Sequence, residues 1–431
     1  MFLFLVVVFF LTTLLIINPR KIFILFFGGL ILFYFPFQQG LLFTVGGAKI
    51  YFGDLVLASL LFFLLLRLLV RGFANLPLHK STILFLLFFI WGIVAVIRGI
   101  PSYSYSAVGE ARWYIFPMIY YFFVITMFKN RQEIRYLINW VIKFIVIMVF
   151  FRFIEFFSFG GNEGLVGQAS FRFLNSVEAL LLSFLFVSIY LFFISGGIKK
   201  HKPTVILFLS TLFVVLIIGQ VRSVWVAMSV GIIAAYILLK KISIRGIIIS
   251  IGLLSLTLLV PIIGNFIDED VYATLARSAI FLQNPREDPT GSWRLRGWRQ
   301  NFEEAMKQPI LGEGIGRYSE WFDGHKWQRV AVHNGYIMNF LKFGLVGFLL
   351  LFIGLFYWYA EMRRYVRVES DRYYKFMGYA IQICVITHLI YTLFYDFTIF
   401  FWILLAAGTI LTLNYNYSHI VESYNQEALS K

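Results

Sequence analysis

Apolar residues along this chain come in long, nearly uninterrupted runs separated by short polar breaks. Runs such as Ile22–Phe37 and Val205–Gly219, with their flanks, approach the roughly 20 apolar residues that a helix needs to cross hydrocarbon. Membrane-spanning strands would instead show alternating segments of about 10 residues. The pattern therefore predicts an all-α, polytopic membrane helical bundle of about 12–13 transmembrane helices, the larger number applying if Met1–Ile17 spans.

Basic clusters assign a side of the membrane to each end of these helices. They follow every second predicted helix, as the positive-inside rule requires of cytoplasmic loops. Met1–Ile17 has neither a basic leader nor a small-residue cleavage site, so we expect it to remain a membrane helix. The basic clusters are Arg20/Lys21, Arg67/Arg71/Lys80, Lys129/Arg131/Arg135, Lys199/Lys200/Lys202, Lys240/Lys241/Arg245 and Arg363/Arg364/Arg367/Arg372.

One long hydrophilic stretch, from about Asn265 to Asn334, falls on the opposite, outer side. It holds ten of the 22 acidic residues, and the segment Trp298–Lys307 has the pattern of a short amphipathic helix. We therefore predict a large, partly helical outer loop over residues 265–332, inserted between transmembrane helices. Because there is no regular repeat and no low-complexity linker, residues 1–431 are interpreted as a single transmembrane domain.

Composition and charge exclude several classes of protein. Hydrophobic residues make up 60% of the chain and charged residues 14%, well below the roughly 25% of a soluble domain. The net charge of +15 is explained by basic inner loops, so no nucleic-acid partner is expected. The one cysteine, Cys384, excludes an internal disulfide and a cysteine zinc cluster, and no two histidines have metal-ligand spacing. No metal and no other cofactor are expected.

The most specific local pattern is His333-Asn334, nine residues, and then Gly344-x-x-Gly347, at the start of the helix after the long loop. Eleven residues are about three helical turns, which would place His333, Gly344 and Gly347 on one face. The glycines would let a neighbouring helix approach closely and hold the histidine in place. The alternative remains that Asn334 caps the helix and His333 is a solvated loop residue.

Several arginines map to the outer side. Arg222 lies between two apolar runs, where a guanidinium is costly unless an anion or a carboxylate meets it. A guanidinium is a planar fork of donors that matches phosphate oxygens, so these arginines favour an anion site. For Arg112 and Arg172, local pairing with an acid is an equal alternative. The other outer-side arginines are Arg294 and Arg296, which are followed by Trp298, and Arg317. Arg317 follows the glycines of residues 312–316. We interpret this glycine segment as a tight turn, because no βαβ unit surrounds it as a nucleotide-binding loop would require.

Together these segments resemble the O-antigen ligase family, membrane glycosyltransferases that share the O-antigen ligase/polymerase domain. Gln220-Val221-Arg222-Ser223 is similar to the family's Ser-Arg segment, although Val221 replaces the usual small residue. Arg294–Trp298 resembles its Arg-x-x-x-Trp element, and Pro309–Gly314 its Pro-x-x-Gly-x-Gly turn. The His333 pattern fits the family signature at every constrained position. The resemblance covers residues 220–347.

The resemblance implies an inverting, metal-independent transfer of a glycan from an undecaprenyl-diphosphate carrier, at the periplasmic face of the bacterial inner membrane. Arg222 and Arg294 would stabilise the departing diphosphate, and His333 would act as general base or orient the acceptor hydroxyl. Asn334, Gly344 and Gly347 would be structural. Lower-ranked candidates for binding the diphosphate are Arg296, Arg317, Arg172 and Arg112.

Three functions remain open from the sequence. A ligase would transfer the glycan to lipid A-core in lipopolysaccharide biosynthesis, and the complete histidine signature slightly favours it. A polymerase would transfer the glycan to another carrier-linked unit. A flippase or transporter of lipid-linked sugars would also need many helices and inward arginines, but not the outer histidine, and no internal symmetry of a transporter is visible.

Overall fold

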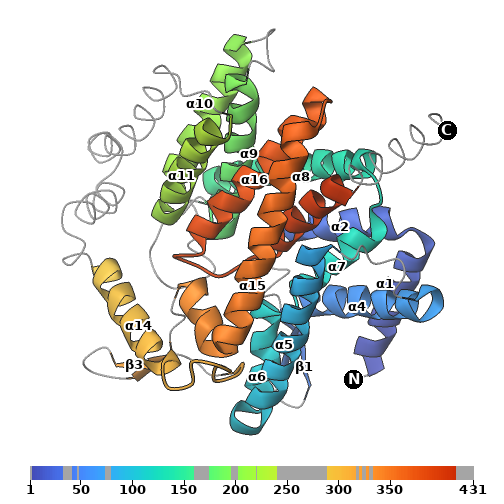
Figure 1. Cartoon of the computed structure of the whole chain (residues 1–431), viewed down its shortest axis with the longest axis vertical. Coiled ribbons are helices and arrows are strands. Elements are labelled where there is room, and N and C mark those ends of the chain that lie inside the picture. Colours follow the sequence, from blue (N-terminus) through green and yellow to red (C-terminus); the bar gives the residue numbers. More distant parts are fainter. Residues whose placement is uncertain are drawn as a thin grey trace, which may run out of the picture.

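The protein is a bundle of helices, accompanied by two small β-hairpins (Figure 1). This computed structural model describes residues 2–32, 41–45, 48–72, 79–159, 174–195, 202–219, 221–239, 289–316, 320–322, 327–329 and 333–413. A helix at Ile399–Leu413 ends the described chain. The preceding elements are α1 (Phe2–Ile17), α2 (Pro19–Leu32), β1 (Leu41–Val45), β2 (Ala48–Tyr51), α4 (Phe52–Arg71), α5 (Lys80–Tyr103), α6 (Tyr105–Tyr114), α7 (Met118–Met127), α8 (Arg131–Phe159), α9 (Ser176–Ile194), α10 (Lys202–Ile218), α11 (Arg222–Leu239), α14 (Pro289–Ala305), β3 (Glu320–Phe322), β4 (Trp327–Arg329), α15 (Gly335–Val368) and α16 (Arg372–Tyr391).

Five of the described helices, α4, α5, α8, α9 and α15, are long and apolar enough to cross a membrane. Shorter apolar helices, among them α7 and Ile399–Leu413, accompany them. The all-α polytopic membrane fold predicted from the sequence is confirmed. Part of the predicted number of spans concerns residues outside the described ranges. The antiparallel hairpins β1–β2 and β3–β4 were not predicted, because strands of three to five residues leave no distinct hydropathy pattern.

Apolar side chains cover the outside of the bundle as well as its interior. Ile97 on α5 and Leu349 and Phe356 on α15 are 60%, 45% and 69% exposed. Inside, aromatic rings pack against one another, as where Phe85 meets the edge of Trp402 at 5.8 Å. Large exposed apolar surfaces are rare on proteins that face water, so this distribution agrees with helices surrounded by lipid.

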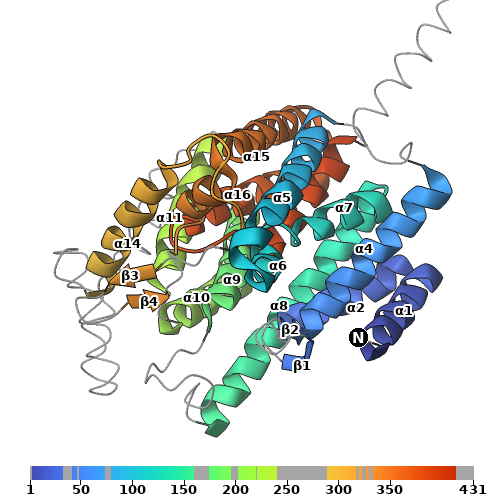
Figure 2. The same cartoon turned by 90° about the horizontal axis from the view of Figure 1, so that it is seen from below.

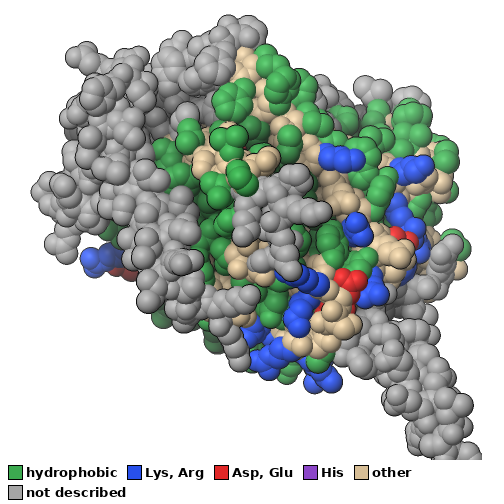
Figure 3. Space-filling model, turned by 90° about the horizontal axis from the view of Figure 1, so that it is seen from above, with side chains coloured by type: hydrophobic (Ala, Val, Ile, Leu, Met, Phe, Trp, Pro, Cys, Tyr) green, Lys and Arg blue, Asp and Glu red, His purple; other side chains and the backbone are tan. Residues whose placement is uncertain are grey.

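Three of the basic clusters predicted to face one side of the membrane are linked by ion pairs to acidic residues at one end of the bundle. Arg20 pairs with Glu133 at 2.8 Å, and Arg131 lies 3.6 Å from Glu369, just beyond the end of α15. Figure 3 looks onto the upper end of the bundle in Figure 1, and Lys and Arg side chains outnumber acidic ones on that face. We call this the basic end.

The helix α15 runs from the opposite end to the basic end, and it is kinked at Gly344. The backbone of Gly344 has φ of 64° and ψ of −167°, which an L-residue adopts only with strain. The kink receives the turn of residues 309–316, since the N–H groups of Leu345 and Val346 donate to the carbonyls of Pro309 and Ile310. A β-carbon on Gly344 would lie 2.3 Å from the Ile310 oxygen.

The predicted single helical face from His333 to Gly347 is therefore wrong. The helix begins after His333, and the docked turn breaks its regular geometry at Gly344. Gly347 does face a neighbouring helix, because an added β-carbon would lie 2.9 Å from the Trp91 ring of α5. In both Figure 1 and Figure 2, α5 and α15 lie side by side.

Gly344→Ala is expected to destabilise the protein by at least about 2–3 kcal/mol, because strained backbone and a clash with Ile310 act together. The free energy of unfolding in a denaturing-detergent titration measures this. Gly297→Ala is the matched control: nothing lies within 4 Å of the added carbon, and alanine is the better helix former by about 0.5–1 kcal/mol. Equal stability of the Gly344→Ala variant and the wild type would contradict the role assigned to the kink.

Candidate active site

The helix α14 is held against the first turns of α15. Ala305 near the end of α14 is buried with Met338 and Leu341, and the ring of Phe302 stacks on Phe340 at 6.2 Å. Earlier on α14, Trp298 lies 6.4 Å from Phe394. This packing directs the beginning of α14, which carries Arg294, toward the residue that precedes α15.

That residue is His333, and its backbone is held in an uncommon conformation. Its φ is 47°, in the left-handed region that histidine tolerates better than bulkier residues do. The next residue, Asn334, caps α15, since its side chain accepts hydrogen bonds from the N–H groups of Tyr336 and Ile337, each at 3.1 Å. Of the two interpretations left open by the sequence, the cap is present, but the His333 side chain is partly buried rather than solvated.

A turn between α16 and the last helix completes the surroundings of His333. The N–H of Gly335 donates to the carbonyls of Thr392 and Tyr395, both at 2.9 Å, which fixes the turn against the start of α15. The ring of Tyr395 meets His333 edge-on at 5.7 Å, and the Arg294 guanidinium lies 5.9 Å from the centre of the same ring. Arg294 and His333, 39 residues apart in sequence, therefore flank one tyrosine.

Burial and the nearby Arg294 charge lower the pKa of His333 from 6.5 to about 4. Burial is the larger cause. The imidazole is therefore neutral at neutral pH and carries a lone pair that can accept a proton. The folded protein binds fewer protons than the unfolded chain between pH 4 and 6.5, so this group lowers stability as the pH falls through that window.

Arg294→Gln is expected to raise the pKa of His333 but to leave it below 6.5, because the larger contribution, burial, remains. An NMR titration of histidine-labelled protein in micelles measures it. Arg299→Gln is the control, since Arg299 is exposed on the same helix and pairs with Glu303 at 2.8 Å. A wild-type pKa near 6.5, or no rise on replacing Arg294, would contradict the arrangement.

A buried group of charges lies at the same end of the bundle. The ammonium of Lys342, on α15, is fully buried and 2.5 Å from Glu110 of α6. The other Glu110 oxygen accepts the N–H of Gly316 at 2.6 Å, so one carboxylate joins α6, α15 and the docked turn. Asp396, next to Tyr395, accepts a longer hydrogen bond from the Tyr114 hydroxyl at 3.4 Å.

Burial raises the pKa of Asp396 to about 6, an effect that the Lys342 charge opposes. Sequence reasoning did not select Asp396, Lys342 or Glu110. The available indication was an ionisable residue inside an apolar run, which in a membrane protein marks a paired or functional group. Lys342 has this setting, but its partner is 232 positions away along the chain and cannot be identified from sequence.

The remaining predicted site residues differ in what surrounds them. Arg112 lies 2.7 Å from Asp54 and over the Tyr51 ring, which is the local pairing that the sequence left as an alternative. Arg296 is exposed on α14, two residues after Arg294. Arg172 and Arg317 lie outside the described residues.

Arg222 begins α11, and only its backbone is described. Contacts along the neighbouring helices fix its level in the bundle. Gly231 of α11 packs on Thr387 of α16. Tyr236, five residues further along α11, contacts Tyr190 of α9, and the nearby Ser188 of α9 contacts Cys384, which precedes Thr387 on α16. Later residues of α11 therefore lie beside earlier residues of α16. Since α11 runs antiparallel to α16, its first residue lies at the end of the bundle where α16 stops and the Thr392–Thr398 turn begins.

Among the described residues, no three His, Cys, Asp or Glu side chains are grouped as metal ligands would be. Around Tyr395, the described residues bring together the Arg294 guanidinium, the neutral His333 imidazole and the Asp396 carboxyl, with Lys342 nearby.

Comparison with known families matches the part of the chain that holds Arg294 and His333. Residues 205–352 match the O-antigen ligase family. The chain carries an O-antigen ligase domain. The chain is thus a multi-pass membrane protein in which residues 205–352 are similar to O-antigen ligases. No curated protein matches the chain.

The O-antigen ligase domain covers α10, α11, α14 and the first half of α15, and so includes Arg222, Arg294 and His333. The residues that surround them come largely from elsewhere. Tyr395 and Asp396 lie after the matched segment and Glu110 lies before it. The domain therefore reaches its described geometry only together with α6 and the turn after α16.

Proposed function

We propose that this O-antigen ligase-type protein is an inverting, metal-independent glycosyltransferase. It would transfer a glycan from undecaprenyl diphosphate to a sugar hydroxyl of lipid A-core, at the periplasmic face of the inner membrane. The observation that supports this most is the meeting of Arg294 and His333 on Tyr395. A cation beside a neutral imidazole suits a reaction in which an anion departs while a hydroxyl loses its proton.

In the proposed reaction, the acceptor oxygen attacks the anomeric carbon of the donor glycan. A new carbon–oxygen bond forms on one face while the bond to the carrier diphosphate breaks on the other, which inverts the configuration. His333 takes the hydroxyl proton, and the electron pair of the broken bond leaves on the diphosphate. Arg294 and Arg222 would stabilise that growing charge, which fixed cations do effectively in a site of low dielectric.

The donor itself would prepare His333 for this role. A pKa of about 4 makes the imidazole a weak base before the donor binds. A diphosphate bound beside Arg294 would offset the guanidinium charge and favour the protonated imidazole, so the pKa of His333 would rise when the donor binds. The base would thus gain strength once its substrate is in place.

Arg222→Ala is expected to lower the rate of glycan transfer by roughly 10²–10³-fold, the loss typical of removing one charge-stabilising group. Transfer by purified protein in lipid nanodiscs measures it. Arg364→Ala, an exposed arginine near the basic end of α15, is the control and should transfer at the wild-type rate. Wild-type transfer by the Arg222→Ala variant would remove this residue from the mechanism.

The function as a whole is tested by incubating purified protein with an undecaprenyl-diphosphate glycan and each acceptor, with a chelator present. A product on lipid A-core is the expected result. Lengthening of the carrier-linked glycan instead would identify a polymerase. Movement of the carrier lipid across vesicles with no new glycosidic bond would identify a flippase. Loss of transfer with chelator, restored by a divalent cation, would overturn metal independence.

A further inference from the structure

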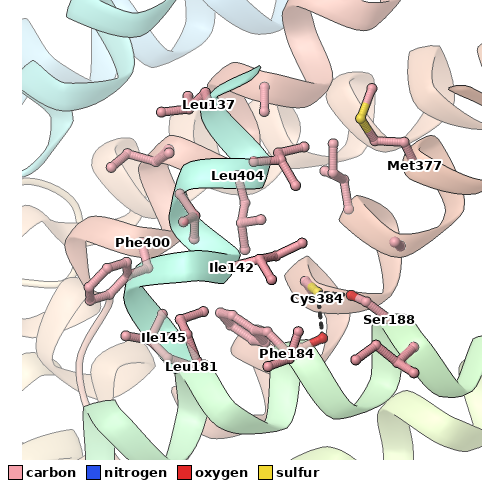
Figure 4. Close-up of a pocket in the computed structure, with 18 of the residues that line it drawn as sticks. Leu137, Ile142, Ile145, Leu181, Phe184, Ser188, Met377, Cys384, Phe400 and Leu404 are labelled. Atoms are coloured by element: carbon pink, nitrogen blue, oxygen red, sulfur yellow. Dashed lines mark hydrogen bonds between the residues drawn. The ribbon is translucent and has the colours of Figure 1, made fainter. Parts of the chain in front are cut away.

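An apolar cavity of about 330 Å³ lies within the bundle, between α8, α9, α16 and the last helix. Figure 4 shows side chains from these elements, among them Ile142, Phe184, Cys384 and Phe400, around a common space. Its volume is more than twice the roughly 150 Å³ of an engineered apolar cavity that stays dry and binds benzene. The space is large enough for a length of hydrocarbon chain.

The few polar atoms in the cavity wall already have partners. The Ser188 hydroxyl and the Cys384 thiol lie 3.6 Å apart, and the thiol also reaches the Phe184 carbonyl at 3.8 Å. A buried water needs two to four polar partners, which this wall does not offer. An apolar occupant is therefore favoured over water.

The cavity opens at the side of the bundle and toward its basic end. Ile142 and Tyr373, both in its wall, are 39% and 37% exposed. Two guanidinium groups stand over aromatic rings of the same wall: Arg135 lies 4.6 Å from the Tyr373 ring centre, and Arg372 lies 5.7 Å from that of Phe376. Tyr373 and Phe376 are three residues apart on α16 and so neighbour each other on its surface.

Neither guanidinium is neutralised by a carboxylate of the described residues. In the part of the chain that the structure describes, Arg372 donates to the Ser195 carbonyl at 3.4 Å, and Arg135 lies over the Tyr373 ring and hydrogen-bonds this tyrosine. The nearby Arg131 differs, since Glu369 pairs with it. Two cations at the rim of an apolar space complement a molecule with an anionic head and a hydrocarbon tail.

We propose that this cavity binds an acyl chain of an anionic phospholipid, whose phosphate is held by Arg135 and Arg372. The positive-inside rule assigns the basic end to the cytoplasmic leaflet, where anionic headgroups attract cations by about 1 kcal/mol each. The lipid would fill the space between α8 and α16 from the membrane side. This site is separate from the one around His333, which lies at the other end of α15.

Lipid binding is tested by native mass spectrometry of the purified full-length protein with phosphatidylglycerol or phosphatidylcholine of matched chains. We expect phosphatidylglycerol to bind preferentially. Replacing both arginines (Arg135→Gln with Arg372→Gln) should weaken its binding roughly ten- to thirty-fold. The double control Arg364→Gln with Arg367→Gln removes the same charge from exposed positions of α15, which does not line the cavity, and should not weaken it.

The chain site is tested separately by filling it. Ala380→Phe places a ring in the cavity wall and should reduce binding of both lipids, whereas Ala234→Phe on α11, outside the wall, should not. Because a filled cavity can also impair folding, the wild-type protein is additionally labelled with phosphatidylglycerol that carries a photoreactive group in its chain. Labels on α8, α9 or α16 near Ile142, Phe184 and Cys384 are expected.

Three results would overturn the proposal. They are equal binding of the two phospholipids by the wild type, photolabels only on other parts of the chain, and a cavity occupied by a polyprenyl lipid or by a second copy of the protein. The glycan-transfer assay does not enter this test, so failure of either proposal leaves the other standing.

Discussion

His333→Ala is expected to lower the rate of glycan transfer by roughly 10²–10⁴-fold, the contribution typical of a positioned general base. The imidazole is partly buried, neutral at neutral pH, and flanks Tyr395 together with Arg294. Without it, the acceptor hydroxyl would have to lose its proton to water in a site that packing makes poorly accessible. Initial rates with purified donor and lipid A-core measure the effect.

Two controls separate chemistry from folding in this experiment. His79 precedes α5 at the basic end and lies 3.3 Å from Glu361, which is near the far end of α15 from His333. The His79→Gln variant should therefore transfer glycan at the wild-type rate. A cooperative thermal unfolding transition of the His333→Ala variant at neutral pH would show that the variant is folded, so that its loss of transfer is a loss of chemistry. Undiminished transfer by His333→Ala would exclude the histidine as base.

Lys342→Met is expected to destabilise the protein by about 3–5 kcal/mol, the cost of leaving a buried charge without its partner. Lys342 is fully buried, and its loss would strand the Glu110 carboxylate, which is only 11% exposed. Because Glu110 also holds the Gly316 N–H, the docked turn would lose one of its attachments. The free energy of unfolding measured in a denaturing-detergent titration tests this.

The matched control is Lys307→Met, which also breaks a lysine–glutamate pair. Lys307 lies 2.6 Å from Glu304 but is 66% exposed, so the expected loss is roughly 0–1 kcal/mol. Combining Lys342→Met with Glu110→Gln should recover part of the stability, because no unpaired charge then remains. If Lys342→Met and Lys307→Met lowered the free energy of unfolding by similar amounts, the buried pair would contribute no more stability than the exposed one.

Both predictions concern the turn of residues 309–316 and its surroundings, at the end of the bundle opposite the basic end. The Lys342–Glu110 pair and the kink at Gly344 secure the turn of residues 309–316. The Arg98 guanidinium adds hydrogen bonds of 2.8 Å to the carbonyls of Leu311 and Gly312. This turn immediately follows α14, so it sets where α14 stands and where Arg294 meets His333. We therefore expect damage to the turn to impair transfer through position rather than through chemistry.

The family's glycine-rich turn has a structural explanation in these contacts. Gly312, Gly314 and Gly316 all have positive φ, and the turn packs backbone to backbone on α15 and α5. A β-carbon on Gly312 would lie 2.4 Å from the Gly344 nitrogen. Glycine is needed here because two main chains approach closely, which agrees with interpreting the segment as a tight turn and not as a nucleotide loop.

The sequence by itself determined that this is a polytopic membrane protein. A helix that crosses the hydrocarbon core needs a long run of apolar residues, and the lengths and flanking charges of such runs are local properties of the sequence. It also supplied the family resemblance and named His333, Arg294 and Arg222, because short motifs preserve residue types at fixed spacing. It did not predict the hairpins, and it misjudged the helix around Gly344, because the turn that kinks α15 acts through backbone contacts.

Only the tertiary structure decided which groups meet. Arg294 and His333 both contact Tyr395, which follows them by more than 60 residues. Lys342 pairs with Glu110, which is 232 positions away along the chain. Arg112, a candidate by sequence, is instead paired with Asp54. The cavity between α8, α9, α16 and the last helix also arises from packing alone. Such contacts depend on how helices distant in sequence pack, and spacing along the chain carries no record of that.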